Sequence, residues 1–404
     1  MSSWAPSSSF PLIPPLQYLG RPGNHVKVGI VGLPNVGKSS FFNTLSKLNV
    51  PMENRPFCTI DPNVARVPVP DARFDNLVKA YHPKSEVPAV LTITDIAGLV
   101  AGAADGAGLG NAFLSHIQAV DGIYHMLRCF RDPEVIHVDG SVDPVRDAET
   151  IHNELRLKDL QNVSREIEST RKSAHRGGAG AKERLFEFGT LEKVKAWLED
   201  NKDVRAGTWT AGEIEILNKH LFLTAKPMIY LANLSESGFI RKSNKHLPLL
   251  AEWAKARGAG DIIIPFSVEF EQNVASSQIA SLPTPEARAA MEKEKGARSM
   301  LPRILKAGYR GLHLCHYFTA GEDEVRAWTI RVGCKAPQAA GVIHTDFEHG
   351  FICADAFSYE DFVEHGSELE IKSAGKLRTE GRKYVVQDGD VLHFKFNTSG
   401  GKKK

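Results

Sequence analysis

Short apolar runs alternate with amphipathic stretches along the first two thirds of this 404-residue chain. A continuous apolar run bounded by turn residues is typical of a strand buried inside a sheet. The stretch 39–45, which follows the first run after the glycine-containing segment 32–38, instead has the character of a helix. The predicted strands lie at 26–31, 90–96, 121–130, 227–232 and 262–267. This alternation predicts an α/β domain.

A heavily charged stretch at about 147–218 interrupts the alternation. Apolar residues recur there at three- and four-residue spacings, first in 154–167 and again in 185–198, which is the period of amphipathic helices. The glycine-rich break 177–180 separates them. We therefore expect an antiparallel helical hairpin inserted between two strands of the sheet. Its charges form either a solvated face or a partner surface, and the sequence leaves both open.

The C-terminal part reads as a second, strand-rich module. Apolar strands are predicted at 314–319 and 326–331, and 384–396 alternates apolar and polar residues around an Asp-Gly turn. The expected parts are a flexible tail, an α/β domain containing the hairpin, a helical connector, a small sheet domain and a basic tail. Their expected limits are 1–24, 25–285, 286–312, 313–397 and 398–404.

Composition narrows the class of protein. The chain is 42% hydrophobic and 24% charged, as in soluble globular proteins, and no apolar run approaches the length of a membrane span. The net charge of +2 is too small to indicate a nucleic-acid partner for the whole chain. The five cysteines lack C-x-x-C spacing, so reduced thiols in the cytoplasm are expected. We expect a monomer without a membrane partner, and a nuclear location stays open.

A phosphate-binding loop follows the first strand. Residues 32–39 match the pattern G-x-x-x-x-G-K-[ST] and lead into the predicted helix, which is the context that this motif requires. The glycines let backbone N–H groups face the phosphates, Lys38 neutralises β/γ charge, and the Ser39 hydroxyl can ligate Mg²⁺. The sequence therefore predicts a nucleoside triphosphate site with Mg²⁺ as its metal.

Two further segments fit nucleotide-sensing switches. Thr59, in the proline-bounded segment 56–62, is placed to bring its hydroxyl to Mg²⁺. Asp95 and Gly98 form a D-x-x-G motif, in which the Asp holds Mg²⁺ through water and the Gly N–H contacts the γ-phosphate. Leu99 stands where many GTPases place a glutamine that orients the attacking water. Leucine cannot bind a water, so hydrolysis needs another group or a partner.

Three polar residues are candidates to assist hydrolysis in place of the absent glutamine. His137, and less strongly His116, are candidate water-orienting groups beside the catalytic Lys38, although most histidines in such positions are structural or solvated. Asn35 is a candidate ligand for K⁺ beside the phosphates, and the alternative is an Asx hydrogen bond within the loop.

The base is read by the segment after the 227–232 strand. Guanine readers place N-K-x-D there, and this chain has Asn233-Leu234-Ser235-Glu236. Leucine replaces the lysine that packs along the base, and the carboxylate is one methylene longer, so guanine-specific geometry is weakened. Ser267, at the end of the last predicted strand, lies at the position of the final base-contacting loop.

These motifs together resemble the Obg-like ATPase, or YchF, family over about 26–397. The resemblance is carried by GLPNVGKS, PFCTIDPN, DIAGLV, NLSE and APQAAGVIHTDFEHGFICAD. It implies a cytoplasmic ATPase with residual GTPase activity that associates with ribosomes, expected at the large subunit in translation regulation. The departures are Ser40, where the family usually has threonine, and Ala101, where some members have a basic residue.

The resemblance also assigns site residues. It implies that Ser39 and Thr59 reach Mg²⁺, that Leu234 contacts adenine with Asn233, and that His137 replaces the catalytic glutamine. Glu236 and Ser267 complete the expected nucleotide site. The residues implied to hold the phosphates are Asn35, Val36, Gly37, Lys38, Ser39 and Ser40.

The C-terminal module resembles a TGS domain, a small ubiquitin-like (β-grasp) module of RNA-associated proteins. Its basic residues fit either RNA contact or simple solubility. They are Lys372, Lys376, Arg378, Arg382 and Lys383. The leading hypothesis is thus an ATP-preferring switch hydrolase. The alternatives are a nucleotide-dependent binding module with negligible hydrolysis and a GTP-preferring, ribosome-associated GTPase.

Overall fold

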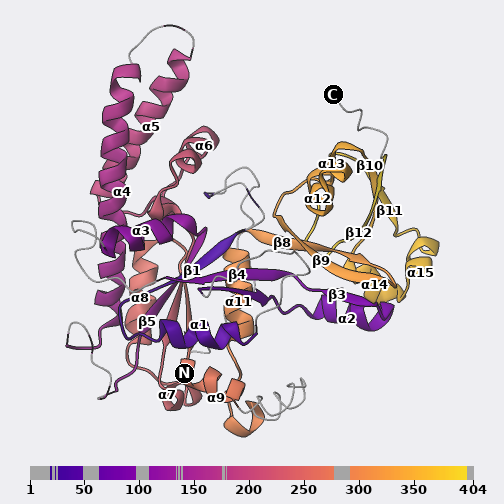
Figure 1. Ribbon diagram of the computed structural model, residues 1–404, viewed down its shortest axis with the longest axis horizontal. Coiled ribbons are helices and arrows are strands. Elements are labelled where there is room, and N and C mark those ends of the chain that lie inside the picture. The colour runs from indigo at the N-terminus through magenta and orange to yellow at the C-terminus, as the bar shows by residue number, and fades with distance from the viewer. Residues whose placement is uncertain are drawn as a thin grey trace.

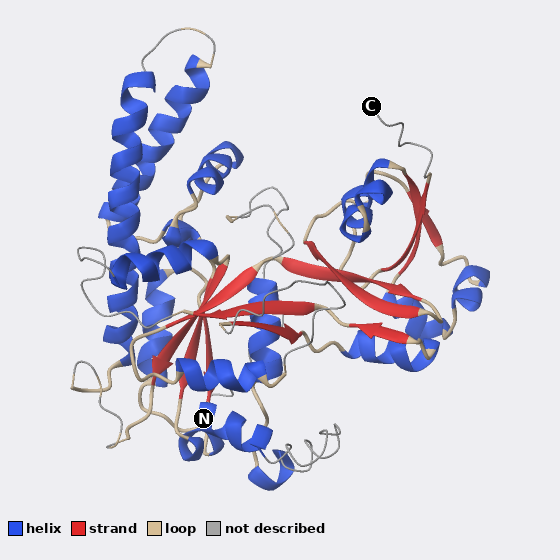
Figure 2. Cartoon of the chain, in the orientation of Figure 1, coloured by secondary structure: helices blue, strands red, loops and turns tan. Residues whose placement is uncertain are grey.

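Two six-stranded sheets organise the chain (Figures 1 and 2). The computed structural model describes residues 19, 20, 23, 26–48, 63–96, 109–132, 134, 137, 140–174, 178, 180–276 and 292–397. The basic tail 398–404 and most of the predicted N-terminal tail lie outside these residues. Within the described part of the chain, no helix has the length and apolar character needed to cross a membrane.

The first sheet confirms the predicted α/β fold. Its strand order is β2-β4-β1-β5-β6-β7, and every neighbouring pair is parallel except β2 with β4. The central strands β5 and β6 are buried along their whole length, which explains why they read as continuous apolar runs. The strands are β1 Lys27–Val31, β2 Val64–Pro68, β4 Val90–Asp95, β5 Gly122–Arg128, β6 Met228–Asn233 and β7 Ile262–Phe266.

Helices pack against both faces of this sheet (Figure 2). Among them α11 approaches the sheet closely, because a Cβ at Gly308 would lie 2.0 Å from the Tyr124 hydroxyl oxygen. That hydroxyl donates to the carbonyl of Ile304 at 2.9 Å. These helices are α1 Lys38–Ser46, α3 Leu109–Ala119, α7 Glu236–Ile240, α8 Leu247–Arg257, α9 Val268–Ser276 and α11 Leu301–Gly311.

The predicted helical hairpin is α4 (Pro144–Ala174) with α5 (Ala181–Glu199), and it projects away from the sheet (Figure 1). The first turns of α4 bury Ala148, Ile151 and Leu155 in the main core. Further along, its Val163 joins a separate core with α5. One long helix therefore serves both as crossover and as hairpin arm. The elements that return to β6 are η1 Val204–Ala206, α6 Ala211–His220 and η2 Leu223–Ala225.

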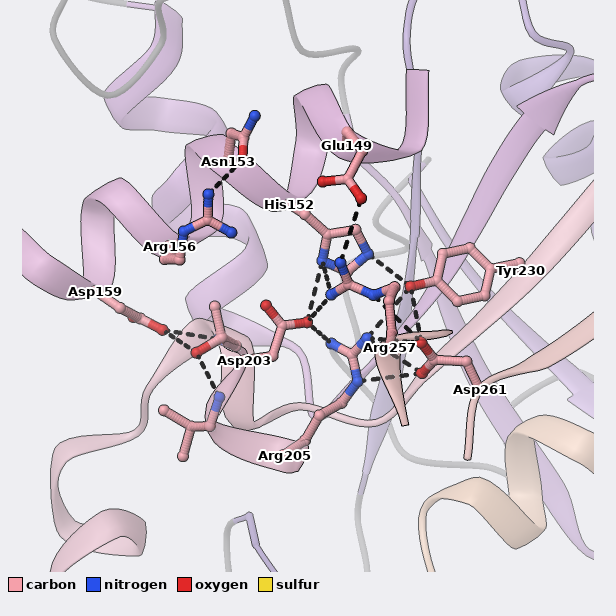
Figure 3. Close-up of polar contacts among 12 residues, drawn as sticks. Glu149, His152, Asn153, Arg156, Asp159, Asp203, Arg205, Tyr230, Arg257 and Asp261 are labelled. Carbon is pink, nitrogen blue, oxygen red and sulfur yellow. Dashed lines mark hydrogen bonds and ion pairs between the residues drawn. The ribbon is translucent and has the colours of Figure 1, made fainter. Parts of the chain in front are cut away.

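A buried network of charges fastens the base of the hairpin to the sheet (Figure 3). Asp203 Oδ2 lies 2.8 Å from Arg205 Nη1 and 2.5 Å from Arg257 Nη2. Arg205 also pairs with Asp261 at 3.1 Å, and His152 Nδ1 lies 3.1 Å from Asp203 Oδ2. His152 lies on α4, Arg257 on α8 and Arg205 on η1, while Asp203 and Asp261 directly precede η1 and β7, so the network ties the hairpin to the sheet. We call Asp203, Arg205, Arg257, Asp261 and His152 the hairpin-base network.

The second sheet has the order β11-β10-β12-β8-β9-β3. Its edge strand β3 (Ser85–Val87) comes from between two strands of the first sheet and pairs in parallel with β9. The other strands are β8 Leu314–Ala320, β9 Glu324–Arg331, β10 Phe351–Phe357, β11 Arg378–Glu380 and β12 Val391–Phe396. Its helices are α12 Ala336–Ile343, α13 Thr345–His349, α14 Tyr359–His365 and α15 Glu368–Ser373.

The segment that carries β3 also carries α2 (Ala72–Tyr81), which packs on the second sheet. Arg73 pairs with Asp71 at 2.7 Å and with Asp388 at 3.1 Å, while His316 Nε2 lies 2.8 Å from Asp71 Oδ2. Sequence analysis assigned this segment to the α/β domain. In the structure it joins the C-terminal sheet. Local pattern could not predict this, because its partners lie more than 200 residues away along the chain.

Candidate functional site

The phosphate loop connects β1 to α1 at the carboxyl edge of the first sheet. Gly37 has a φ of +101° and Asn35 a φ of +61°, so the loop turns twice through the left-handed region. A Cβ at Gly32 would lie 2.5 Å from the Met126 carbonyl oxygen, and one at Gly37 would lie 2.7 Å from Asn233 Nδ2. Both glycines are therefore required by close neighbours as well as by the motif.

Lys38 is buried beneath this loop, with 8% of its surface exposed. Its Nζ donates to the Leu33 carbonyl oxygen at 2.8 Å. Burial lowers the pKa of Lys38 to about 8, although the nearby Asp95 carboxylate opposes that shift. An anionic ligand at the loop would offer this ammonium group a partner far stronger than a carbonyl.

Strand pairing brings Asp95 to the phosphate loop. Asp95 at the end of β4 is the register partner of Ile30 in β1. Ser39 Oγ donates to Asp95 Oδ2 at 3.4 Å, whereas Asp95 Oδ1 is buried without a hydrogen-bond partner among the described residues. Burial raises the pKa of Asp95, against the opposing effects of Lys38 and Ser39. A buried, unsatisfied carboxylate oxygen beside a hydroxyl fits a hard cation such as Mg²⁺.

Asn233 joins the phosphate loop to the segment 233–236, which we call the base loop. Its Nδ2 donates to the Val36 carbonyl oxygen at 3.0 Å, and its Oδ1 accepts from the Val268 N–H at 3.0 Å. Asn233 is buried, and the side chain of Val36 packs in the core. Asn233 thus fixes the distance between the expected phosphate and base contacts.

The other residues near the expected base differ in where their side chains point. Leu234 is only 3% exposed and gives its N–H to the Phe266 carbonyl, and Ser267 is fully buried. Their side chains therefore pack inward. The carboxylate of Glu236 instead accepts from Lys295 Nζ at 2.7 Å and from Asn273 Nδ2 at 2.8 Å. Sequence analysis did not include Lys295 or Asn273, because no local motif links them to Glu236.

The two candidate histidines occupy contrasting environments. His137 is 8% exposed, and its Nε2 lies 2.9 Å from Asp147 Oδ2 near the start of α4. Asp147 Oδ1 in turn pairs with Arg146 at 3.0 Å. His116 is exposed on α3. Ser40 is half-buried on α1 and Asn35 is exposed, whereas Thr59, Gly98, Leu99 and Ala101 lie outside the described residues.

Comparisons with known proteins agree with this geometry. A family model described as "50S ribosome-binding GTPase" matches residues 27–167. A second model, YchF-GTPase_C, described as "Protein of unknown function (DUF933)", matches residues 314–397. These matches cover most of the sheet with the phosphate loop and the C-terminal sheet, respectively.

Relatives extend the likeness over nearly the whole chain. Obg-like ATPase 1 of Oryza sativa subsp. japonica is 57% identical over 386 residues, covering 96% of each chain. Obg-like ATPase 1 of Homo sapiens is 54% identical over 394 residues, covering 97% of this chain and 98% of that protein. The solved Schizosaccharomyces pombe YchF GTPase is 49% identical, with a TM-score of 0.85 over 94% of this chain and all of that one. The resemblance drawn from the motifs is thereby confirmed, and this chain, with its P-loop domain of the GTPase type, belongs to the Obg-like ATPase (YchF) family.

Proposed function

We propose that the protein hydrolyses ATP in preference to GTP and acts as a nucleotide-dependent switch that associates with the large ribosomal subunit. The observation that carries this proposal is the cluster of Lys38, Ser39 and Asp95. Lys38 has only a carbonyl as partner, and Asp95 Oδ1 has no donor among the residues that the structure describes. A phosphate with its metal would give both groups a stronger partner.

The phosphate loop supplies the binding groups. Backbone N–H groups of residues 35–40 face the phosphates, and Lys38 exchanges the Leu33 carbonyl for a phosphate oxygen. Ser39 and Thr59 are the proposed direct Mg²⁺ ligands, with Asp95 acting through water. Mg²⁺ neutralises charge on the β- and γ-phosphates. Gly98 is the proposed γ-phosphate contact, and Asn35 the proposed ligand of K⁺.

The base loop supports a preference for adenine. Leu234 has no ammonium group to lie along a guanine, and Asn233 is already bonded to the phosphate loop and to Val268. The relatives' name, Obg-like ATPase 1, agrees with this choice of base. We therefore place ATP first and GTP as the weaker ligand.

Hydrolysis requires a substitute for the glutamine that Leu99 replaces. His137 is the proposed substitute, because a histidine paired with a carboxylate has a fixed ring orientation, as a general base needs. The nearly complete burial of its ring means that this role requires exposure of His137 when ATP is bound. Lys38 would stabilise charge that develops on the transferred phosphate.

The C-terminal sheet domain is the proposed contact with ribosomal RNA, in keeping with its likeness to a TGS domain. All five of its candidate basic residues are exposed. The description of the matching model as a 50S ribosome-binding GTPase supports the large subunit as client. Cytoplasmic location follows from that partner.

Equilibrium affinities for ATP and GTP, measured side by side with Mg²⁺ and K⁺, test the choice of base. We expect tighter binding of ATP, and tighter binding of GTP would establish the GTP-preferring alternative.

Turnover of ATP, with a Lys38→Ala control and with added large subunits, tests whether the protein hydrolyses ATP. Turnover equal to that of the control under every condition would leave a binding module without hydrolysis.

Co-sedimentation tests the ribosome. We expect the ATP-loaded protein to pellet with large subunits and Lys383→Glu to weaken the association. The matched control is Lys182→Glu on the hairpin helix α5, which reverses the same charge on another exposed surface. Equal pelleting with both subunits, or with neither, would contradict this part of the proposal.

A further inference from the structure

Glu236 stands where guanine readers place their aspartate, yet side chains from outside the base loop hold both of its oxygens. Lys295 Nζ donates to Oε1 at 2.7 Å, and Asn273 Nδ2 donates to Oε2 at 2.8 Å. Glu236 and Lys295 are 20% and 28% exposed, so this ion pair is largely shielded from water. The charge of the carboxylate is therefore paired, and its orientation is set by two side chains, before any base arrives.

The surrounding helices fix the position of Lys295. Its Nζ lies 5.9 Å from the centre of the Phe270 ring, which is fully buried in α9. Phe270 packs on Phe239 of α7 with ring centres 5.1 Å apart. The helices α7 and α9 lie side by side below the first sheet (Figure 1). Lys295 thus lies over the small apolar cluster that α7 and α9 form, and α7 begins at Glu236.

A buried carboxylate anchors the segment 292–300 that carries Lys295. Glu271 of α9 accepts from Ser299 Oγ at 2.6 Å and from the Met300 N–H at 2.7 Å. Glu292 accepts from the Ser299 N–H at 3.0 Å. These hydrogen bonds fix the segment 292–300 against α9. The position of Lys295 next to Glu236 is therefore set by the packing of its segment.

Guanine and adenine respond differently to this arrangement. A carboxylate recognises guanine by accepting from its N1–H and its exocyclic amine, which needs both oxygens. Adenine presents no such pair of donors at that edge. Holding the carboxylate toward Lys295 and Asn273 therefore weakens a contact that guanine would use and leaves adenine unaffected.

We propose that Lys295 and Asn273 are specificity-determining residues, which disfavour GTP by holding the carboxylate of Glu236 away from the base. The inference rests on the proposed nucleotide-binding function of the base loop. It assigns to the segment before α11 a part in base selection that no local motif indicates.

The test is a Lys295→Met/Asn273→Leu double variant, with affinities for ATP and GTP measured by calorimetry. We expect the ratio of the GTP to the ATP dissociation constant to fall by about tenfold, the size of one hydrogen bond to a charged group. Lys293→Met is the matched control, because it removes the same charge from an exposed position two residues away. Loss of a positive charge that weakens the binding of both nucleotides equally does not change the ratio of their dissociation constants.

Adding Glu236→Gln to the double variant shows whether the freed carboxylate is responsible. We expect the triple variant to return to the parent ratio. An unchanged ratio in the folded double variant, or a gain that survives Glu236→Gln, would overturn the inference. The parent protein's own ratio tests the proposed ATP preference separately, so the two ideas can fail independently. Thermal unfolding of each variant confirms that it is folded.

Discussion

Two groups of buried charges in the α/β domain differ in how they are paired with opposite charges. In the hairpin-base network every charged side chain faces an opposite charge within 3.7 Å. At the phosphate loop, Lys38 bonds to a neutral carbonyl instead of a carboxylate. Among the described residues Asp95 Oδ1 has no hydrogen-bond partner, which is also true of Asp203 Oδ1 in the network, so the two groups differ in their ion pairs. The difference indicates that the first group serves the fold, whereas the second awaits a ligand.

The largest expected effect comes from breaking the network. Burial raises the pKa of Asp203, but His152 and the two arginines outweigh it and hold that pKa well below its usual range. Asp203→Asn should lower the free energy of unfolding by about 3 to 5 kcal/mol, because it removes the negative charge that both arginines share and leaves Asp261 as their only other buried carboxylate within the network. Chemical denaturation measures this. The affinity of the folded variant for ATP should stay at the parent value.

The matched control is Asp200→Asn, which loses an exposed ion pair with Lys202 and should cost less than about 1 kcal/mol. The pH dependence of this stabilisation follows from the lowered pKa of Asp203. Its contribution to the free energy of unfolding is fully present above 3.8, the pKa of the unfolded chain. It should be lost as the pH falls below that value. Equal destabilisation by both variants would contradict the distinction between the two groups.

The second effect concerns the phosphate loop. Lys38→Met should weaken ATP binding by about 3 kcal/mol, roughly 150-fold, through loss of a charge-assisted hydrogen bond. It should not lower the free energy of unfolding, because the buried ammonium group is already disfavoured. Calorimetry and denaturation measure the two quantities. Lys47→Met, an exposed lysine just after the same helix, is the control. Destabilisation without loss of affinity would assign Lys38 to the scaffold.

A third effect sharpens the comparison through pH. With the pKa of Lys38 near 8 in the free protein, the ammonium group that binds phosphate is lost as the pH rises through that value. ATP affinity should fall about tenfold, or about 1.4 kcal/mol, between pH 7 and pH 9. Lys38→Arg keeps its charge and should show a flat profile. Parallel profiles for parent and variant would rule out titration of Lys38.

The smallest effect comes from Asp95. Because burial raises its pKa, the ionised carboxylate disfavours folding at neutral pH, and Asp95→Asn should stabilise the nucleotide-free protein. The gain should be less than about 1 kcal/mol, since the partly exposed group is screened by solvent. It should shrink as the pH falls and the parent carboxyl takes up a proton. Denaturation at several pH values measures it, and a loss of stability at pH 7 would contradict it.

Much of the fold could be predicted from local pattern. The apolar runs locate β1, β4, β5, β6 and β7, and the helical period with its glycine break predicts α4 and α5. The edge strand β3 could not be predicted in this way. Its three residues have no apolar run, and their pairing with β9 depends on residues about 240 positions away.

The residues of the candidate site can likewise be separated into those that local sequence predicts and those that tertiary packing brings together. By itself the sequence determined the phosphate loop, Asp95 and the base loop, because glycine torsions, strand ends and motif spacing are properties of neighbouring residues. Tertiary structure alone decided that Lys295 holds Glu236, that Asp147 holds His137, and that α2 and β3 serve the second sheet. Hydrogen bonds and ion pairs act over a few ångströms, so partners distant in sequence are chosen only when packing brings them together.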